Sequence, residues 1–207
     1  MAAGPIVPYI IRRVVNRAVR VAGLAGATLA TGLLASTEVG HRVDVGLFRT
    51  VNRGRGPGAD RFFRGITELG SIWASIGAAG VLAMGNRRRA AVRGLAAASA
   101  AWLAGQGLKR LFGRARPYEA DPNRVRLLAH PPRATSWPSS HPAVLLAFVT
   151  VAGRDLGVSP TARTAMRGLA AAVGISRTYV GVHYPADVLG GLLLGQAVAD
   201  AVSQDPR

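Results

Sequence analysis

The sequence predicts an all-α membrane protein, a polytopic bundle of about six transmembrane helices. Hydrophobic residues make up 49% of the 207 residues, and the charged residues, 17% of the chain, cluster between long stretches that carry no charge. A helix that crosses a bilayer needs about 20 mainly apolar residues, and several of these stretches approach that length. The mean hydropathy of +0.24 argues against a disordered basic tail.

Four charge-free stretches and two shorter apolar stretches are the expected spans. The helices are rich in alanine and glycine, and such small residues let membrane helices approach closely. We therefore expect a tightly packed bundle that forms one domain over residues 1–207. The alternative is a soluble helical protein with an alanine-rich core, but the second stretch lacks the polar face of a surface helix. In chain order the expected spans are 21–37, 69–86, 94–108, 134–153, 164–176 and 188–199.

The net charge of +16 comes from 26 basic and 10 acidic residues, and every basic residue except Lys109 is an arginine. Such a charge is also typical of nucleic-acid-binding proteins, which remain an alternative. In a six-span protein whose N-terminus is inside, the short inner segments are densest in arginine, as at 87–89. This pattern favours a cytoplasmic N-terminus. The arginine-, alanine- and glycine-rich composition indicates a bacterial protein, which we expect in the cytoplasmic membrane.

Three polar clusters stand at the ends of the expected spans. The first runs from Lys109 to Pro117, the second occupies 138–141, and the third occupies 176–187. If consecutive spans alternate in direction, all three clusters meet at one face of the membrane. The absence of cysteine excludes disulfides, thiolate zinc sites and a cysteine nucleophile.

The residue types in these clusters suit phosphoryl transfer. Arginine binds phosphate oxygens with two donors, and lysine adds a compact positive charge. A proline follows His141 and suits the start of a helix, so the backbone at 139–140 should face an anion at that helix end. A second proline starts the last helix and places Asp187 where its carboxylate can orient His183. An oriented histidine beside cations, with a second histidine as acid, describes catalysis by a histidine nucleophile.

The three patterns together resemble the type 2 phosphatidic acid phosphatase (PAP2) superfamily, which also contains bacterial acid phosphatases and vanadium haloperoxidases. They read Lys-x6-Arg-Pro, Pro-Ser-x-His and Ser-Arg-x5-His-x3-Asp, and they span a core over residues 109–187. The segment 66–71 resembles the family too. The resemblance implies a PAP2-like fold and an integral membrane phosphatase that acts on a lipid phosphate or pyrophosphate, with its active site facing outward.

The resemblance also implies a role for each site residue. His183 would attack phosphorus and form a phosphohistidine while Asp187 holds it, and His141 would protonate the leaving group and then activate water. No metal or other cofactor is implied, because the cations take the place of magnesium. Ser140 departs from the glycine that is usual at its position. The residues expected to bind phosphate are Lys109, Arg116, Ser139, Ser140 and Arg177.

The expected partners are a lipid phosphate substrate and membrane lipids, with no nucleic acid. The candidate substrates are a polyprenyl phosphate or pyrophosphate, phosphatidic acid and phosphatidylglycerol phosphate; the sequence gives neither the lipid nor the oligomeric state. A vanadate-dependent haloperoxidase on the same fold remains a second alternative. We expect Arg110 and Arg114, at the variable positions of the first motif, to be interfacial anchors, and residues 122–132 to form an outer loop over the site.

Overall fold

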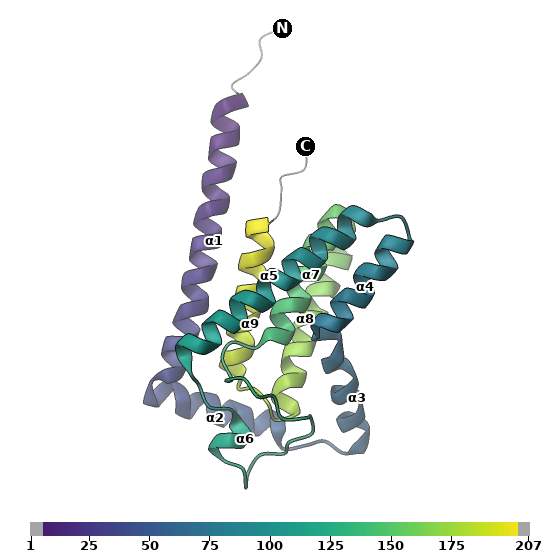
Figure 1. Cartoon of the computed structure of the whole chain (residues 1–207). Coiled ribbons are helices and arrows are strands. Elements are labelled where there is room, and N and C mark those ends of the chain that lie inside the picture. The colour runs from purple at the N-terminus through teal and green to yellow at the C-terminus, as the bar shows by residue number, and fades with distance from the viewer. Residues whose placement is uncertain (1–5, 203–207) are drawn as a thin grey trace.

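The computed structural model describes residues 6–202. Within this range the chain is helical and contains no strand, so the all-α prediction is confirmed (Figure 1). The elements are α1 (Ile6–Ser36), α2 (Glu38–Asn52), α3 (Pro57–Thr67), the short 3-10 helix η1 (Glu68–Gly70), α4 (Ile72–Met84), α5 (Arg88–Phe112), α6 (Pro117–Ala120), α7 (Ser140–Asp155), α8 (Pro160–Tyr179) and α9 (Pro185–Val202).

The long helices form a bundle around α7, which packs against α5, α8 and α9. Helix α1 lies along α9, and α4 lies along α5. The short helices α2 and α6 gather at one end of the bundle, together with the loop between α6 and α7 (Figure 1). The start of α1 and the end of α9 lie at the opposite end. The three motif clusters therefore share one end of the bundle.

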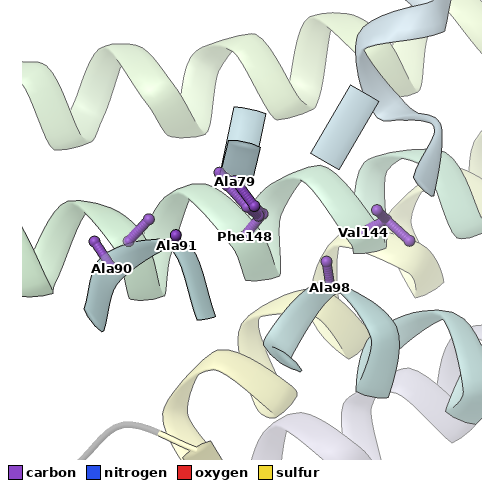
Figure 2. Close-up of a cluster of buried hydrophobic side chains, with 7 residues drawn as sticks. Ala79, Ala90, Ala91, Ala98, Val144 and Phe148 are labelled. Atoms are coloured by element: carbon purple, nitrogen blue, oxygen red, sulfur yellow. The ribbon is translucent and has the colours of Figure 1, made fainter. Parts of the chain in front are cut away.

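Small side chains fill the interior between α4, α5 and α7. Figure 2 shows alanines of α4 and α5 beside Val144 and Phe148 of α7. A second cluster includes Ala97 and Ala101 of α5, which have no exposed surface. Side chains of this size let the helix backbones approach closely, as the composition predicted.

Two glycines bring α9 against the start of α7. A Cβ atom at Gly195 would lie 2.5 Å from the carbonyl oxygen of Ala143, and one at Gly191 would lie closer still to the oxygen of Ser139. Any side chain at these positions would push α9 away from α7. Because α7 and α9 each carry a motif at their N-terminal ends, these glycines set the spacing between two parts of the candidate site.

The count of six membrane spans is not confirmed. By length and composition, two helical segments between residues 6 and 202 could each cross a membrane, namely 11–36 of α1 and all of α9. The pair α3 and α4, bent by 66°, would make a third if it formed one broken span. Helix α7 has 16 residues, and α5 and α8 carry several basic residues.

Two expected boundaries also shift. The stretch 69–86 is α-helical only over 72–84 because a 3-10 turn precedes it. Helix α7 starts at Ser140, two residues before the proline expected to begin it. A proline in the first helical turn is tolerated because the N–H it lacks has no partner inside the helix. His141 therefore lies inside the first turn of α7, and Ser139 is the N-cap.

The close approach of α7 and α9 gives a testable prediction. Gly195→Ala should lower the free energy of unfolding by about 1–3 kcal/mol, because the added methyl group overpacks a backbone contact. Gly80→Ala in α4 is the matched control, since a Cβ atom there meets nothing within 4 Å. Thermal denaturation of the purified protein in detergent measures both, and equal midpoints for the two variants would contradict the prediction.

Candidate active site

One cavity of about 270 Å³ collects residues from all three motif clusters. The N-terminal end of α4 and the side of α5 close it on one side. Ser139 and Asp187 do not line this cavity and lie behind its wall. The six expected site residues that line it are Lys109, Arg116, Ser140, His141, Arg177 and His183.

His183 lies in the turn between α8 and α9, with 2% of its surface exposed. Its Nδ1 atom lies 3.4 Å from Oδ2 of Asp187, and its Nε2 atom lies 3.2 Å from Nη1 of Arg116. A guanidinium can only donate hydrogen bonds, so the adjacent Nε2 is the unprotonated nitrogen and the proton sits on Nδ1. The electron pair of Nε2 therefore points toward Arg116, from which it accepts this hydrogen bond.

Burial lowers the pKa of His183 well below its usual value of 6.5. The hydrogen bond to Asp187 opposes this shift, and the positive charges of Arg116 and Lys109 add to it. The imidazole is therefore neutral at pH 7, which is the form that can act as a nucleophile.

The carboxylate of Asp187 has no exposed surface and is held from several sides. Its Oδ2 atom accepts hydrogen bonds from Oγ of Ser136 at 2.5 Å and from the backbone N–H of Tyr184 at 2.8 Å. Its backbone oxygen accepts the N–H of Ser139 at 2.9 Å. Asp187 therefore joins the start of α9 to the loop that leads into α7.

The ammonium group of Lys109 holds the loop at 135–138 in place beside the cavity. Nζ donates to the carbonyl oxygens of Thr135, Ser136 and Pro138 at 2.9, 3.0 and 2.7 Å. Oγ1 of Thr135 donates back to the carbonyl oxygen of Lys109 at 2.8 Å. An ammonium has three protons, so Lys109 supplies charge to the cavity while it fixes the fold of the 135–138 loop.

Arg116 holds the same loop from the other side. Nε donates to the carbonyl oxygen of Ala134 at 2.6 Å, and Nη1 donates to that of Val182 at 2.8 Å. Nη2 also reaches the carbonyl oxygen of Thr135 at 3.2 Å. The guanidinium thus positions the loop beside His183 while one edge of it borders the cavity.

Several buried polar atoms around the cavity lack a hydrogen-bond partner among the described residues. They are Nε of Arg177 and the hydroxyl of Ser140; the hydroxyl of Ser139, behind the cavity wall, also lacks a partner. Nη1 of Arg177 is held by Oγ1 of Thr67 at 3.0 Å, so its guanidinium is fixed in place. Buried polar groups normally have partners, and unpartnered donors facing a cavity indicate a ligand that accepts hydrogen bonds.

Arg114 is buried, and the prediction that it is an interfacial anchor is wrong. Its side chain is 9% exposed, and it joins two carboxylates: Nη1 lies 2.6 Å from Oδ1 of Asp187, and Nη2 lies 2.6 Å from Oδ2 of Asp44. The guanidinium also stacks on the ring of Tyr184, at 4.4 Å from its centroid. Asp44 in turn accepts the backbone N–H of Ala186 at 2.9 Å. Arg114 thus holds Asp187 on the side away from His183.

A signal for Asp44 exists in the sequence. Asp44, Phe48 and Asn52 recur every four residues, which puts them on one face of α2, and all three are buried. A carboxylate in such a row requires a cation as partner. The partner itself lies 70 residues further along the chain, which no local pattern shows.

The loop at 122–132, expected to lie over the site, borders the cavity at Pro132 and is held in place at its middle. Pro132 and Ala134 line the cavity. Asn52 makes two hydrogen bonds to the backbone of Arg126 in this loop. Its Nδ2 donates to the carbonyl oxygen of Arg126, and its Oδ1 accepts the N–H of Arg126, both at 2.9 Å. A fixed loop gives the cavity a preformed outer wall.

Between residues 6 and 202 no group of three His, Cys, Asp or Glu side chains could hold a metal ion.

These features define a helical protein with a preformed, positively charged cavity beside a neutral, carboxylate-oriented histidine. The chain belongs to the PAP2 superfamily, whose family model matches residues 90–206. It is a membrane lipid phosphatase, as the motifs predicted.

Curated relatives and solved structures agree with this assignment. Decaprenylphosphoryl-5-phosphoribose phosphatase of Mycobacterium tuberculosis is 31% identical over 150 residues, which cover 70% of this chain and 80% of the relative. The protein of the same name from Mycolicibacterium smegmatis is 32% identical over 124 residues, which cover 60% of this chain and 64% of the relative.

Two crystal structures share the fold. The transmembrane PAP2-type phosphatidylglycerolphosphate phosphatase of Bacillus subtilis matches with a TM-score of 0.76 at 24% identity, over 88% of this chain and 94% of that chain. LpxE of Aquifex aeolicus matches with a TM-score of 0.68 at 28% identity, over 76% of this chain and 93% of that chain.

The bridge between the two carboxylates gives a second prediction. Arg114→Met should lower the free energy of unfolding by about 3–5 kcal/mol, because it leaves Asp44 and Asp187 buried without their shared cation. Phosphatase activity should fall as well, because Asp187 loses its anchor. The control is Arg110→Met, which removes an equal charge from an exposed position in the same segment. Thermal denaturation and phosphate release compare the two, and equal stability would contradict the proposed bridge.

The lowered pKa of His183 sets the sign of a pH effect. The unfolded chain binds a proton at this histidine more readily than the folded protein does, so the folded protein loses stability as the pH falls below about 6.5. The thermal midpoint should therefore drop less steeply in His183→Gln than in the wild type between about pH 7.5 and pH 5. Parallel curves would show that His183 does not titrate differently on folding.

Proposed function

We propose that the protein removes a terminal phosphate from a polyprenyl-linked lipid through a phosphohistidine on His183, at the outer face of the bacterial cytoplasmic membrane. The observation that carries this proposal is the position of His183. Its ring lies between the buried carboxylate of Asp187 and the guanidinium of Arg116, at the wall of a cavity that also holds Lys109 and Arg177.

In the first step the phosphate occupies the cavity and its oxygens meet the cations there. Nη1 of Arg116 shifts its hydrogen bond from Nε2 of His183 to a phosphoryl oxygen. Nε2 then attacks phosphorus, and the bond between phosphorus and the leaving oxygen breaks. Asp187 stabilises the positive charge that develops on the imidazole. His141, in the first turn of α7 on the cavity wall, donates a proton to the leaving oxygen.

In the second step a water molecule attacks the phosphohistidine, and His141 takes a proton from it. The bond between phosphorus and nitrogen breaks, so phosphate leaves and both histidines return to their starting forms. The cations stabilise the charge on the phosphoryl oxygens throughout, which is the role of metal ions in other phosphoryl-transfer enzymes.

The geometry refines the roles of the two serines. The N–H of Ser139 is already used by the backbone oxygen of Asp187, so Ser139 mainly fixes the start of α7. Ser140 lines the cavity with an unpartnered hydroxyl. We propose that this hydroxyl donates to a phosphoryl oxygen, an interaction that the usual glycine could not make.

An apolar side of the cavity suits a lipid chain. Ile72, Trp73 and Trp102 line it on α4 and α5, and Trp73 is 75% exposed. The substrate class is taken from the two mycobacterial relatives, which are named as phosphatases of decaprenylphosphoryl-5-phosphoribose. The Bacillus subtilis protein is named as a phosphatidylglycerolphosphate phosphatase, so a phospholipid phosphate is the competing substrate.

We propose six spans with both chain ends at the cytoplasmic side. Five of the spans are α1, α5, α7, α8 and α9, and the sixth is α4 with the residues that precede it. Helices α2, α3 and α6 then lie at the outer face, around the site. The three arginines at 87–89, at the start of α5, support this orientation, because basic residues favour the cytoplasmic side.

The test of function is phosphate release by purified protein over a panel of polyprenyl phosphates, phosphatidic acid and phosphatidylglycerol phosphate. His183→Ala should abolish release, and His141→Ala should slow it by about 10²–10⁴-fold. We expect vanadate to inhibit the wild type and chelators to leave it active. Wild-type turnover by a correctly folded His183→Ala protein would refute the mechanism.

The orientation has a separate test that uses the absence of cysteine. Single cysteines placed at Arg133, in the outer loop, and at Arg88, at the start of α5, provide one reporter at each end of the bundle. An impermeant maleimide should label Arg133→Cys in intact cells and Arg88→Cys only after lysis. The reverse pattern would invert the topology.

A further inference from the structure

A second basic cavity lies between α7 and α8, at the end of these helices away from the candidate active site. Its volume is about 80 Å³. Thr150 lines it, and this residue lies about 15 Å along α7 from the start of that helix at Ser140. None of the lining residues is acidic; they are Val149, Thr150, Arg154, Arg163, Met166 and Arg167.

Two of the three arginines are held in place by their neighbours. Arg154 pairs with Asp200 at 2.8 Å. Nε of Arg163 donates to the carbonyl oxygen of Val158 at 3.0 Å, which leaves the outer nitrogens of that guanidinium for another acceptor. Asp200 is itself shared with Arg20, so this carboxylate does not offset the charges of Arg163 and Arg167.

Arg163 and Arg167 are exposed residues that concentrate positive charge at the start of α8. They lie four residues apart, so they share one helix face, and like charges at this spacing repel each other. Both also lie in the first two turns of α8, where the helix dipole is positive, and the first turn contains no acidic residue. An anion in the cavity would offset the charges of Arg163 and Arg167.

The hydroxyl of Thr150 gives an independent indication. Thr150 is 7% exposed, and its Oγ1 has no hydrogen-bond partner in the part of the chain that the structure describes. Burying a hydroxyl without a partner costs free energy. A ligand oxygen in the cavity would accept this hydrogen bond, and the guanidinium groups provide the paired donors that match a phosphate.

We propose that this cavity binds a phosphate group, supplied by the headgroup of an anionic lipid in the leaflet opposite the candidate active site. Basic pockets between membrane helices are suited to such headgroups. The cavity lies close to the turn between α7 and α8, which is the depth of a headgroup if these helices span the bilayer. The site is separate from the catalytic cavity and does not depend on the proposed reaction.

The experiment measures how ligands raise the thermal midpoint of the full-length protein in detergent micelles. Phosphatidylglycerol, phosphatidylcholine and inorganic phosphate are titrated separately. Phosphatidylglycerol should stabilise the wild type, and phosphatidylcholine should not. The double variant Arg163→Gln/Arg167→Gln should bind phosphatidylglycerol about tenfold more weakly or worse, because two charged donors are lost. Thr150→Val should weaken binding to a smaller extent.

A matched double variant separates a specific site from general charge. Arg87→Gln/Arg88→Gln removes the same charge from exposed positions. These positions lie at the same end of the bundle as the cavity, because Arg93, further along α5, pairs with Asp155 at the end of α7. This control should keep the wild-type response. Phosphate bound in the catalytic cavity affects both double variants equally, so the difference between them reports the second site alone.

The outcomes distinguish the source of the phosphate. Inorganic phosphate alone could give a stabilisation that the Arg163→Gln/Arg167→Gln variant loses. In that case the cavity binds a soluble phosphate ion, and the assignment to a lipid headgroup is overturned. Equal losses in the two double variants, or no stabilisation that depends on Arg163 and Arg167, overturn the site itself. These measurements do not depend on phosphatase activity, so the outcome of the His183→Ala test of the proposed function leaves them unchanged.

Discussion

The buried carboxylate of Asp187 is the constraint on which the rest of the site depends. It has no contact with solvent, so its charge persists only because Arg114, Ser136 and the backbone of Tyr184 surround it. These partners come from the segment that follows α5, the loop before α7 and the turn before α9. Three segments distant in sequence therefore come together around one buried charge. Asp187, held in this way, fixes the orientation of His183.

Small residues make that assembly possible. Gly191 and Gly195 let the backbone of α9 touch that of α7, and alanines do the same between α5 and α7. Polar residues at the helix ends can then meet across short distances. Packing by small residues is weak for each contact, but it is specific in geometry, because helices with such surfaces fit closely in few arrangements.

Sequence reasoning predicted the helical class, the family and the meeting of the three motifs, because these depend on local composition and on the alternation of helix direction. It did not find Arg114 or Asp44, whose pairing joins distant segments. It also took Lys109 only as a phosphate ligand, whereas the structure shows its protons on three loop carbonyls. Backbone acceptors carry no side-chain signature, so no pattern of residue types reveals such bonds. Apolar stretches alone did not give the helix lengths either, because α4 and α7 are shorter than the charge-free stretches that predicted them.

The burial of Lys109 has a practical consequence for chemistry on the intact protein. The chain contains one lysine among 25 arginines, and that lysine is 5% exposed with its ammonium enclosed by carbonyl groups. Amine-reactive reagents therefore have one side-chain target, and the fold shields it. Acylation of this residue reports opening of the loop at 135–138, so a conventional labelling reagent becomes a selective probe of the integrity of the site.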